Sequence, residues 1–110
     1  MNEIKEFKLK DFDTEIQIFA GEQPQIIKLD EFQVPIDYLA LDFDVEVSII
    51  NAKGKHISQL LAKDRTNSPN VSSLANNPEF TVLSISVKIT KPKDVNEKTL
   101  SMAIRYRLME

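Results

Sequence analysis

Strict alternation of apolar and polar residues is the feature that most restricts the fold of this chain. It is longest in LALDFDVEVSI, from Leu39 to Ile49, and it returns at 83–89 and at 100–108. Successive side chains of a β-strand point to opposite faces of a sheet, so each stretch predicts a strand with one apolar and one wet face. The dominant period is therefore two, and not the 3.6 residues of a helix.

Weaker apolar runs predict further strands at 5–10, 12–19 and 25–29. Turn-forming residues end such runs at Gly21 with Pro24, at Pro35, at Pro78, and at Pro92 with Asp94. The most specific turn is NAKG, because Asn51 opens a type I turn well and Gly54 can adopt the left-handed conformation that follows it. We expect a β-hairpin there.

The chain after this hairpin is less patterned. HISQLLA, at 56–62, fits either a returning strand or a short helix. KDRTNSPNVSSLANNPE, at 63–79, is rich in Asn, Ser and Pro and is longer than most loops of compact domains. We interpret it as a surface excursion, with a short helix near 71–75 or a working surface as the alternatives. Its candidate contact residues are Asn67, Asn70 and Asn76.

These elements predict an all-β protein with six to eight strands and at most one short helix. No alternation of strand and helix suggests a parallel sheet, so we expect an antiparallel two-sheet β-sandwich, jelly-roll-like or immunoglobulin-like. At 110 residues the chain has room for one domain, 1–110, with a single core. An open barrel is the alternative. The presence of only two glycines favours regular strands with few sharp corners, and hence the sandwich.

One octapeptide occurs almost twice, as DFDTEIQI at 11–18 and DFDVEVSI at 42–49. The similarity does not extend outward on either side, so a duplicated unit is not favoured. As strands, both copies place their carboxylates on one wet face. A cation such as Ca²⁺ takes carboxylate oxygens, which makes Asp42, Asp44 and Glu46 a candidate metal site. A straight strand spreads its ligands in a line, so a solvated outer face is the favoured interpretation.

Basic residues form a second candidate surface. Arg105 and Arg107 lie on the predicted outward face of the last strand, and Lys8 and Lys10 lie on that of the first. Neighbouring strands could therefore alternate acidic and basic rows, in which each cross-strand pair contributes roughly 0.2–1 kcal/mol. The same complementarity could operate between two copies of the protein, so this face is a candidate contact surface.

Several kinds of chemistry lack the residues that they require. Without cysteine the chain forms no disulfide and no thiolate metal site. The net charge of −3 argues against nucleic acid as a partner. The only histidine, His56, follows a turn glycine and is expected to be exposed, whereas a hydrolase would need it in a cleft. We therefore expect no enzyme, no catalytic residue and no cofactor.

The remaining hypothesis is a protein that acts by contact with other proteins. Neither a signal peptide nor a transmembrane run is evident, so we expect a cytoplasmic protein or one assembled into a particle. The final strand, 99–109, must pair within the sheet or offer its edge to another chain. We predict a non-enzymatic structural or interaction module, a homo-oligomer or accessory component of a virion, secretion device or filament. The alternative is a small-ligand or Ca²⁺-binding sandwich that uses the acidic strand face and the 63–79 loop.

Overall fold

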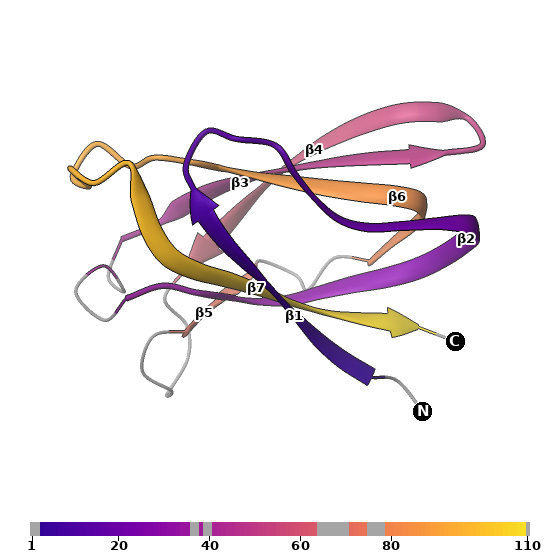
Figure 1. Cartoon of the computed structure of the whole chain (residues 1–110), viewed down its shortest axis with the longest axis horizontal. Helices are drawn as coiled ribbons and strands as arrows, with labels where there is room; N and C mark the ends of the chain where they lie inside the picture. Colours follow the sequence, from indigo (N-terminus) through magenta and orange to yellow (C-terminus); the bar gives the residue numbers. More distant parts are fainter. Residues whose placement is uncertain (1–2, 36–37, 39–40, 64–70, 75–78, 110) are drawn as a thin grey trace.

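The computed structural model describes residues 3–35, 38, 41–63, 71–74 and 79–109 (Figure 1). Within these ranges the chain forms β-strands and no α-helix, which confirms the all-β prediction. The strands are β1 (Glu3–Asp11), β2 (Ile16–Gln33), β3 (Phe43–Asn51), β4 (Gly54–Lys63), β5 (Val71–Leu74), β6 (Glu79–Thr90) and β7 (Thr99–Met109).

All of these strands belong to one antiparallel sheet. Their order is β1-β7-β2-β5-β4-β3-β6, with an additional pairing between β2 and β6. A two-sheet β-sandwich, jelly-roll-like or immunoglobulin-like, is not confirmed, because hydrogen bonds connect every described strand to the same sheet. The sheet is open, since β1 pairs only with β7 among the described strands.

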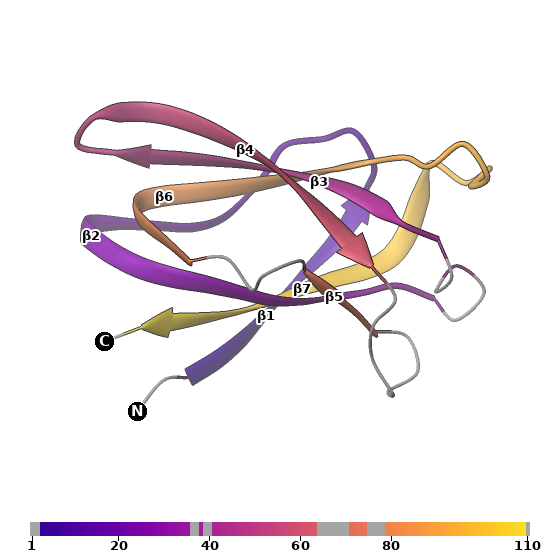
Figure 2. The same cartoon turned by 180° about the vertical axis from the view of Figure 1, so that it is seen from behind.

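A shared bend in β2 and β6 explains how one sheet encloses a core. Figures 1 and 2 show the two strands turning together at one end of the molecule. β2 pairs with β6 on both sides of this turn, through 16–20 before it and 25–28 after it. Between these segments β2 has the residues 21–24, whereas β6 has only Leu83. Extra residues in one strand bend it, so one half of the sheet folds over the other.

Buried side chains from both halves of the sheet form one core. The alternation predicted from the sequence is confirmed in β3 and β7, where the apolar positions Phe43, Val45, Val47, Met102, Ile104 and Tyr106 are buried. In β6 the alternation changes at the bend. Ile85 is buried as predicted, but the next inward residue is Val82, and Leu83 is only half-buried. The bulge shifts the facing of the strand by one residue, which alternation by itself does not reveal.

Three predicted elements differ from the structure. β1 ends at Asp11 and β2 begins at Ile16, so 12–15 is a connection and not part of a strand. The chain turns there because Asp13 has a φ of 58°, a left-handed conformation that Asp tolerates better than most residues. β3 begins only at Phe43, later than predicted. The helix considered near 71–75 is wrong as far as the described residues reach, because 71–74 is the strand β5.

The predicted hairpin between β3 and β4 is confirmed. Asn51 faces Gly54 across the turn, and Gly54 has a φ of 114°, which side-chain-bearing residues rarely adopt. The side chain of Asn51 stabilises the turn, since its Oδ1 accepts a hydrogen bond of 2.8 Å from the backbone N–H of Lys53. The stretch 56–62 continues as β4, so of the two alternatives for it the strand is correct.

Gly54→Ala is expected to lower the free energy of unfolding by about 1 kcal/mol, the lower end of the cost of a strained backbone conformation. A Cβ at this position would meet no atom within 4 Å, so the cost is conformational and not steric. Urea denaturation followed by far-UV circular dichroism measures it. Lys53→Ala, in the same exposed turn, is the control and should change stability little. Equal effects of the two substitutions would contradict the role of the positive φ.

Candidate functional site

Arg105 lies at the centre of a row of charges on the outward face of β1, β7 and β2. Its Nε donates to Oε2 of Glu6 on β1 at 3.2 Å, and its Nη1 donates to Oε2 of Glu31 on β2 at 3.1 Å. These residues are cross-strand neighbours in the register of the sheet. The opposite-charge pairing predicted between neighbouring strands is therefore present here.

Arg107 is held by a second acid on β2. Its Nε and an Nη donate to the two carboxylate oxygens of Asp30 at 2.8 and 2.9 Å, a bidentate arrangement. Asp30 is the extra residue of a bulge, because Leu29 and Glu31 face consecutive residues of β7. The bulge turns the Asp30 side chain toward Arg107. Both arginines thus have partners within their own chain, and a contact with another chain stays a prediction.

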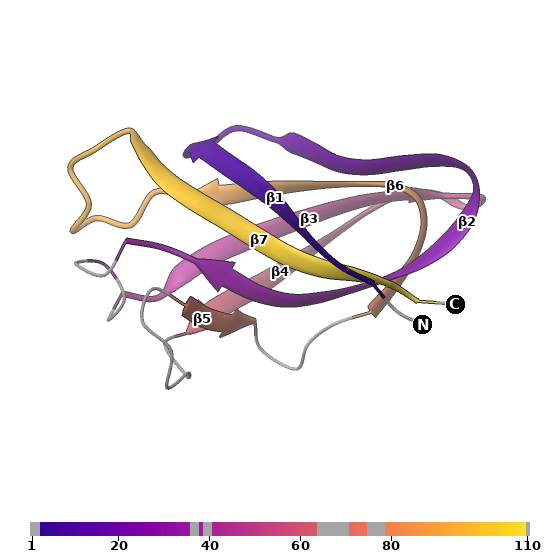
Figure 3. The ribbon, with the colours of Figure 1, turned by 60° about the horizontal axis from the view of Figure 1, so that its bottom comes forward.

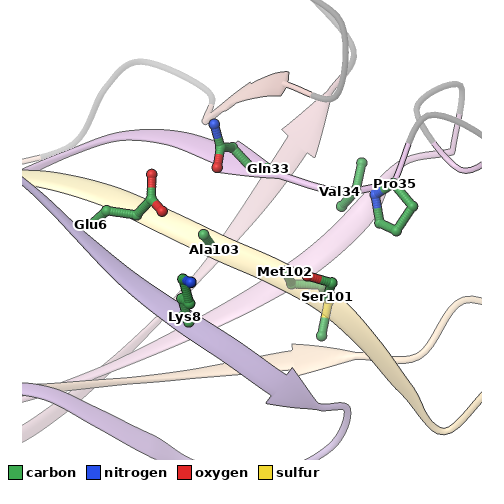
Figure 4. Close-up of a pocket in the computed structure, with 8 residues that line it drawn as sticks. All are labelled: Glu6, Lys8, Gln33, Val34, Pro35, Ser101, Met102 and Ala103. Atoms are coloured by element: carbon green, nitrogen blue, oxygen red, sulfur yellow. The ribbon is translucent and has the colours of Figure 1, made fainter.

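A shallow hollow opens beside this charged row, where the side chains of β7 become small. Ser101 and Ala103 on β7 form its floor between the longer side chains of Lys8 on β1 and Gln33 on β2 (Figure 4). Its volume is about 380 Å³, and Pro35 closes one end. The sequence signal for this hollow is the change from Arg105 and Arg107 to Ala103 and Ser101 along one face of the strand, although alternation alone does not predict a hollow.

Lysines dominate the part of this surface near the edge of the sheet. A second hollow, of about 350 Å³, lies between β1 and the start of β7 and includes Lys8, Lys10 and Asp11. Lys8 borders both hollows. Both lysines are exposed, as predicted, and no ion pair joins either of them to a carboxylate in the described part of the chain. The ammonium groups of Lys8 and Lys10 are therefore available to carboxylates of another chain.

The edge of the sheet lies at β1 and not at the final strand. β7 pairs with β1 from Thr99 to Leu108 and with β2 from Ala103 to Met109, so it lies inside the sheet over most of its length and is not an edge strand (Figure 3). β1 pairs with β7 from Glu3 to Asp11, and no other described strand pairs with it. β4 is a second edge over most of its length, because β5 pairs with it only at Ala62 and Lys63.

The acidic residues of the repeated octapeptide do not gather into a metal site. Asp42 and Asp44 are exposed, while Glu46 accepts a hydrogen bond of 2.9 Å from Gln59 and lies 3.7 Å from the ammonium of Lys88. In the described ranges no group of three or more Asp, Glu or His residues could hold a metal ion. The structure therefore adds no support to the Ca²⁺ hypothesis.

The two octapeptides lie on opposite sides of β6, where Val87 faces Ile16 on one side and Val47 on the other. Asp13 accepts a hydrogen bond of 3.3 Å from the backbone N–H of Lys91, and Glu15 lies 3.9 Å from Lys55. What the copies do bring together is their phenylalanines. The rings of Phe12 and Phe43 stack in the core, with centroids 6.3 Å apart and an angle of 5° between the planes.

Three groups have shifted pKa values, each with a structural cause. A hydrogen bond from the Tyr38 hydroxyl lowers the pKa of Glu97, and the hydrogen bonds to Asp30 raise the pKa of Arg107. Burial raises the pKa of Tyr106, whose hydroxyl donates to the carbonyl of Ile18 at 3.4 Å. None of the shifted groups borders either hollow.

The remaining candidate residues are His56 and three asparagines of the 63–79 segment. His56 is exposed on β4, as predicted, and borders neither hollow, whereas a hydrolase would need it in a cleft. Asn67, Asn70 and Asn76 lie outside the described residues. The surface around Lys8, together with the edge of β1, is thus the best candidate for a contact site.

Comparisons with known proteins leave the family of this chain open. Among the described residues, no helix has the length and apolar character required to span a bilayer. No protein-family model matches the chain, and no curated protein is significantly similar to it.

Proposed function

We propose that this chain is a non-enzymatic interaction module that joins a larger protein assembly by strand addition at β1. The observation that carries the proposal is the outer edge of β1, which faces no described strand over nine residues. An exposed strand edge presents unpaired N–H and C=O groups, and a strand of another chain can satisfy them. The virion, secretion device and filament named above stay predictions.

Selectivity would come from the lysines of this strand. β1 has neither Pro nor Gly, so its backbone can pair with another strand. It contains Lys5, Lys8 and Lys10, which place positive charge along this strand. Lysines on an edge suppress indiscriminate pairing. A partner strand with a carboxylate opposite Lys8 would overcome this barrier, whereas a neutral or basic strand would not. β1 therefore combines an available edge with a charge requirement.

A photo-crosslinking amino acid at Ile4 tests the proposal in extracts of the native cell. Ile4 is 62% exposed on β1, so its replacement does not disturb the core. Ile57, which is 57% exposed on the other edge strand, β4, provides the matched control position. We expect position 4 to give one reproducible adduct, identified by mass spectrometry as protein, and position 57 to give none.

The control position distinguishes between the two edges of the sheet. Adducts from position 57 alone would place the contact on β4 and overturn the assignment to β1. A chain that stays monomeric and gives no adduct from position 4 would overturn the proposed function itself.

A further inference from the structure

We propose that the partner strand at β1 is β1 of a second copy, paired antiparallel around a two-fold axis through Phe7. The inference rests on the proposed function and names its partner. In a two-fold pair, residues at equal distances from the axis on either side face each other. Glu6 of each copy then faces Lys8 of the other, which forms two opposite-charge pairs on the outward face.

Each neighbouring register places a like-charge pair at its axis or next to it. An axis through Glu6 would place Glu6 opposite itself and form no opposite-charge pair. An axis through Lys8 would place Lys8 opposite itself; it would also pair Glu6 with Lys10 and Lys5 with Asp11, but would overlap β1 only at residues 5–11. An axis through Lys5 would place Lys5 opposite itself, and one through Leu9 would place Lys8 opposite Lys10. Like charges directly opposite destabilise a strand pair, whereas opposite charges stabilise it.

The length of the overlap also favours the axis through Phe7. This residue is the midpoint of β1, so all of Glu3–Asp11 pairs with the second copy. An axis through Ile4 would form opposite-charge pairs between Glu3 and Lys5, but it would overlap β1 only at residues 3–5. The axis through Phe7 does bring Glu3 opposite Asp11, and this like-charge contact lies at the two ends of the overlap. The complementary pairs lie at its centre.

The inward face of the strand fits the same arrangement. Phe7 packs against the core but remains partly exposed at the edge. Opposite its equivalent in the second copy it would form an aromatic cross-strand pair that continues the core from one copy into the other. Ile4, exposed on the other face, would lie opposite Lys10, whose aliphatic stem can cover it.

The existing contact of Glu6 does not prevent the new one. Glu6 already accepts a hydrogen bond from Arg105 through Oε2. An ionised carboxylate has about four acceptor sites, so it can bind the ammonium of Lys8 from the second copy as well. Lys8 has no ion pair with a described carboxylate, so it would gain a partner.

The other edge of the sheet lacks this complementarity. β4 contains Lys55 and Lys63 but no acidic residue, so two β4 strands could form no opposite-charge pair in any register. Of the two edges, β1 is therefore the one suited to a second copy of the chain.

Charge reversal at the two facing positions tests the register with purified protein. We expect the wild-type chain to dimerise in sedimentation equilibrium, and Glu6→Lys and Lys8→Glu to weaken self-association by about tenfold or more, since each reverses two pairs. A mixture of the two variants should form heterodimers again, because position 6 of one variant and position 8 of the other would once more carry opposite charges. Weakening by each variant alone, together with rescue on mixing, distinguishes this register from one centred on Lys8, in which Lys8→Glu would only exchange one like-charge pair for another.

Matched controls separate local pairing from changes in net charge or folding. Glu22→Lys and Lys53→Glu make the same charge changes at exposed positions away from β1 and should leave dimerisation unchanged. Thermal melting by circular dichroism checks that every variant folds. Undiminished dimerisation of Lys8→Glu, or a folded mixture without heterodimers, would overturn the register.

A cysteine at the axis gives a second readout, because the natural chain has none. Phe7→Cys is expected to form a disulfide-linked dimer on mild oxidation, whereas Ile4→Cys, which would face Lys10, should form one far more slowly. Similar rates would contradict the axis through Phe7. A wild-type chain that is monomeric when pure, yet gives an adduct with a different protein from position 4, would overturn this inference while leaving the proposed function in place.

Discussion

Phe43→Ala is expected to lower the free energy of unfolding by about 3–5 kcal/mol, the usual cost of removing a fully buried aromatic ring. Phe43 has no exposed surface and contacts two other rings. It stacks on Phe12 and meets the ring of Phe32 edge-on, with centroids 5.2 Å apart and an angle of 77° between the planes. Such aromatic pairs add about 0.5–1.5 kcal/mol beyond the burial of their surface.

The position of these rings makes the effect large. Phe43 belongs to β3 and Phe32 to β2, beyond its bend, so the cluster joins the two halves of the folded sheet. Loss of the central ring would leave a cavity between them that the surrounding strands can fill only in part.

Urea denaturation followed by far-UV circular dichroism measures the change, and Phe19→Ala is the matched control. Phe19 is also a phenylalanine in a strand, but it is only partly buried. Its replacement should therefore cost clearly less. A Phe43 variant that unfolds at the urea concentration of the Phe19 variant would show that the aromatic cluster does not hold the two halves together.

Val82→Ala is expected to lower the free energy of unfolding by about 2 kcal/mol, and Leu83→Ala by less than about 1 kcal/mol. Val82 has no exposed surface, while Leu83 lies half-buried at the bend of β6. The order is the reverse of what side-chain size suggests, because leucine loses more atoms than valine. It is also the reverse of what the alternation of Leu83, Ile85 and Val87 predicts.

The two substitutions serve as controls for each other, since they are adjacent and make the same small residue. Equilibrium denaturation of both variants in one buffer gives the difference directly. A larger loss from Leu83 than from Val82 would mean that β6 keeps a single alternation through the bend, and the bulge opposite it in β2 would then be misplaced.

The repeated octapeptide shows how far local pattern could predict the site. Its shared phenylalanines are core residues, as their apolar face implied, and they stack on each other. Its shared acids were expected to lie on matching strand faces. In the structure they are separate, because Asp13 is in a turn whereas Asp44 is in β3. The shared phenylalanines therefore have the same role, because both are buried. The shared acids have different roles, because the backbone conformation differs between the two copies.

The candidate site, too, could be predicted from the sequence only in part. The outward facing of Lys8, Lys10, Arg105 and Arg107 followed from alternation, because facing is a property of each strand alone. Their neighbours did not follow from it. The placement of β7 between β1 and β2 gives Arg105 its two acids and leaves Lys8 with none in the described residues.

The sequence by itself determined the strand character of the chain, the hairpin at Asn51 and the inward faces of β3 and β7. These features depend on interactions between residues close together in the sequence, for which the period of two and the requirements of a turn are sufficient. The tertiary structure alone decided the single bent sheet, the shift from Leu83 to Val82 and the place of β1 at the edge of the described sheet. Each of these features depends on which strands pair, although they are distant in the sequence, and on which strand of a pair has extra residues. The alternation within a strand is the same whichever strand it pairs with, so alternation alone does not predict these features.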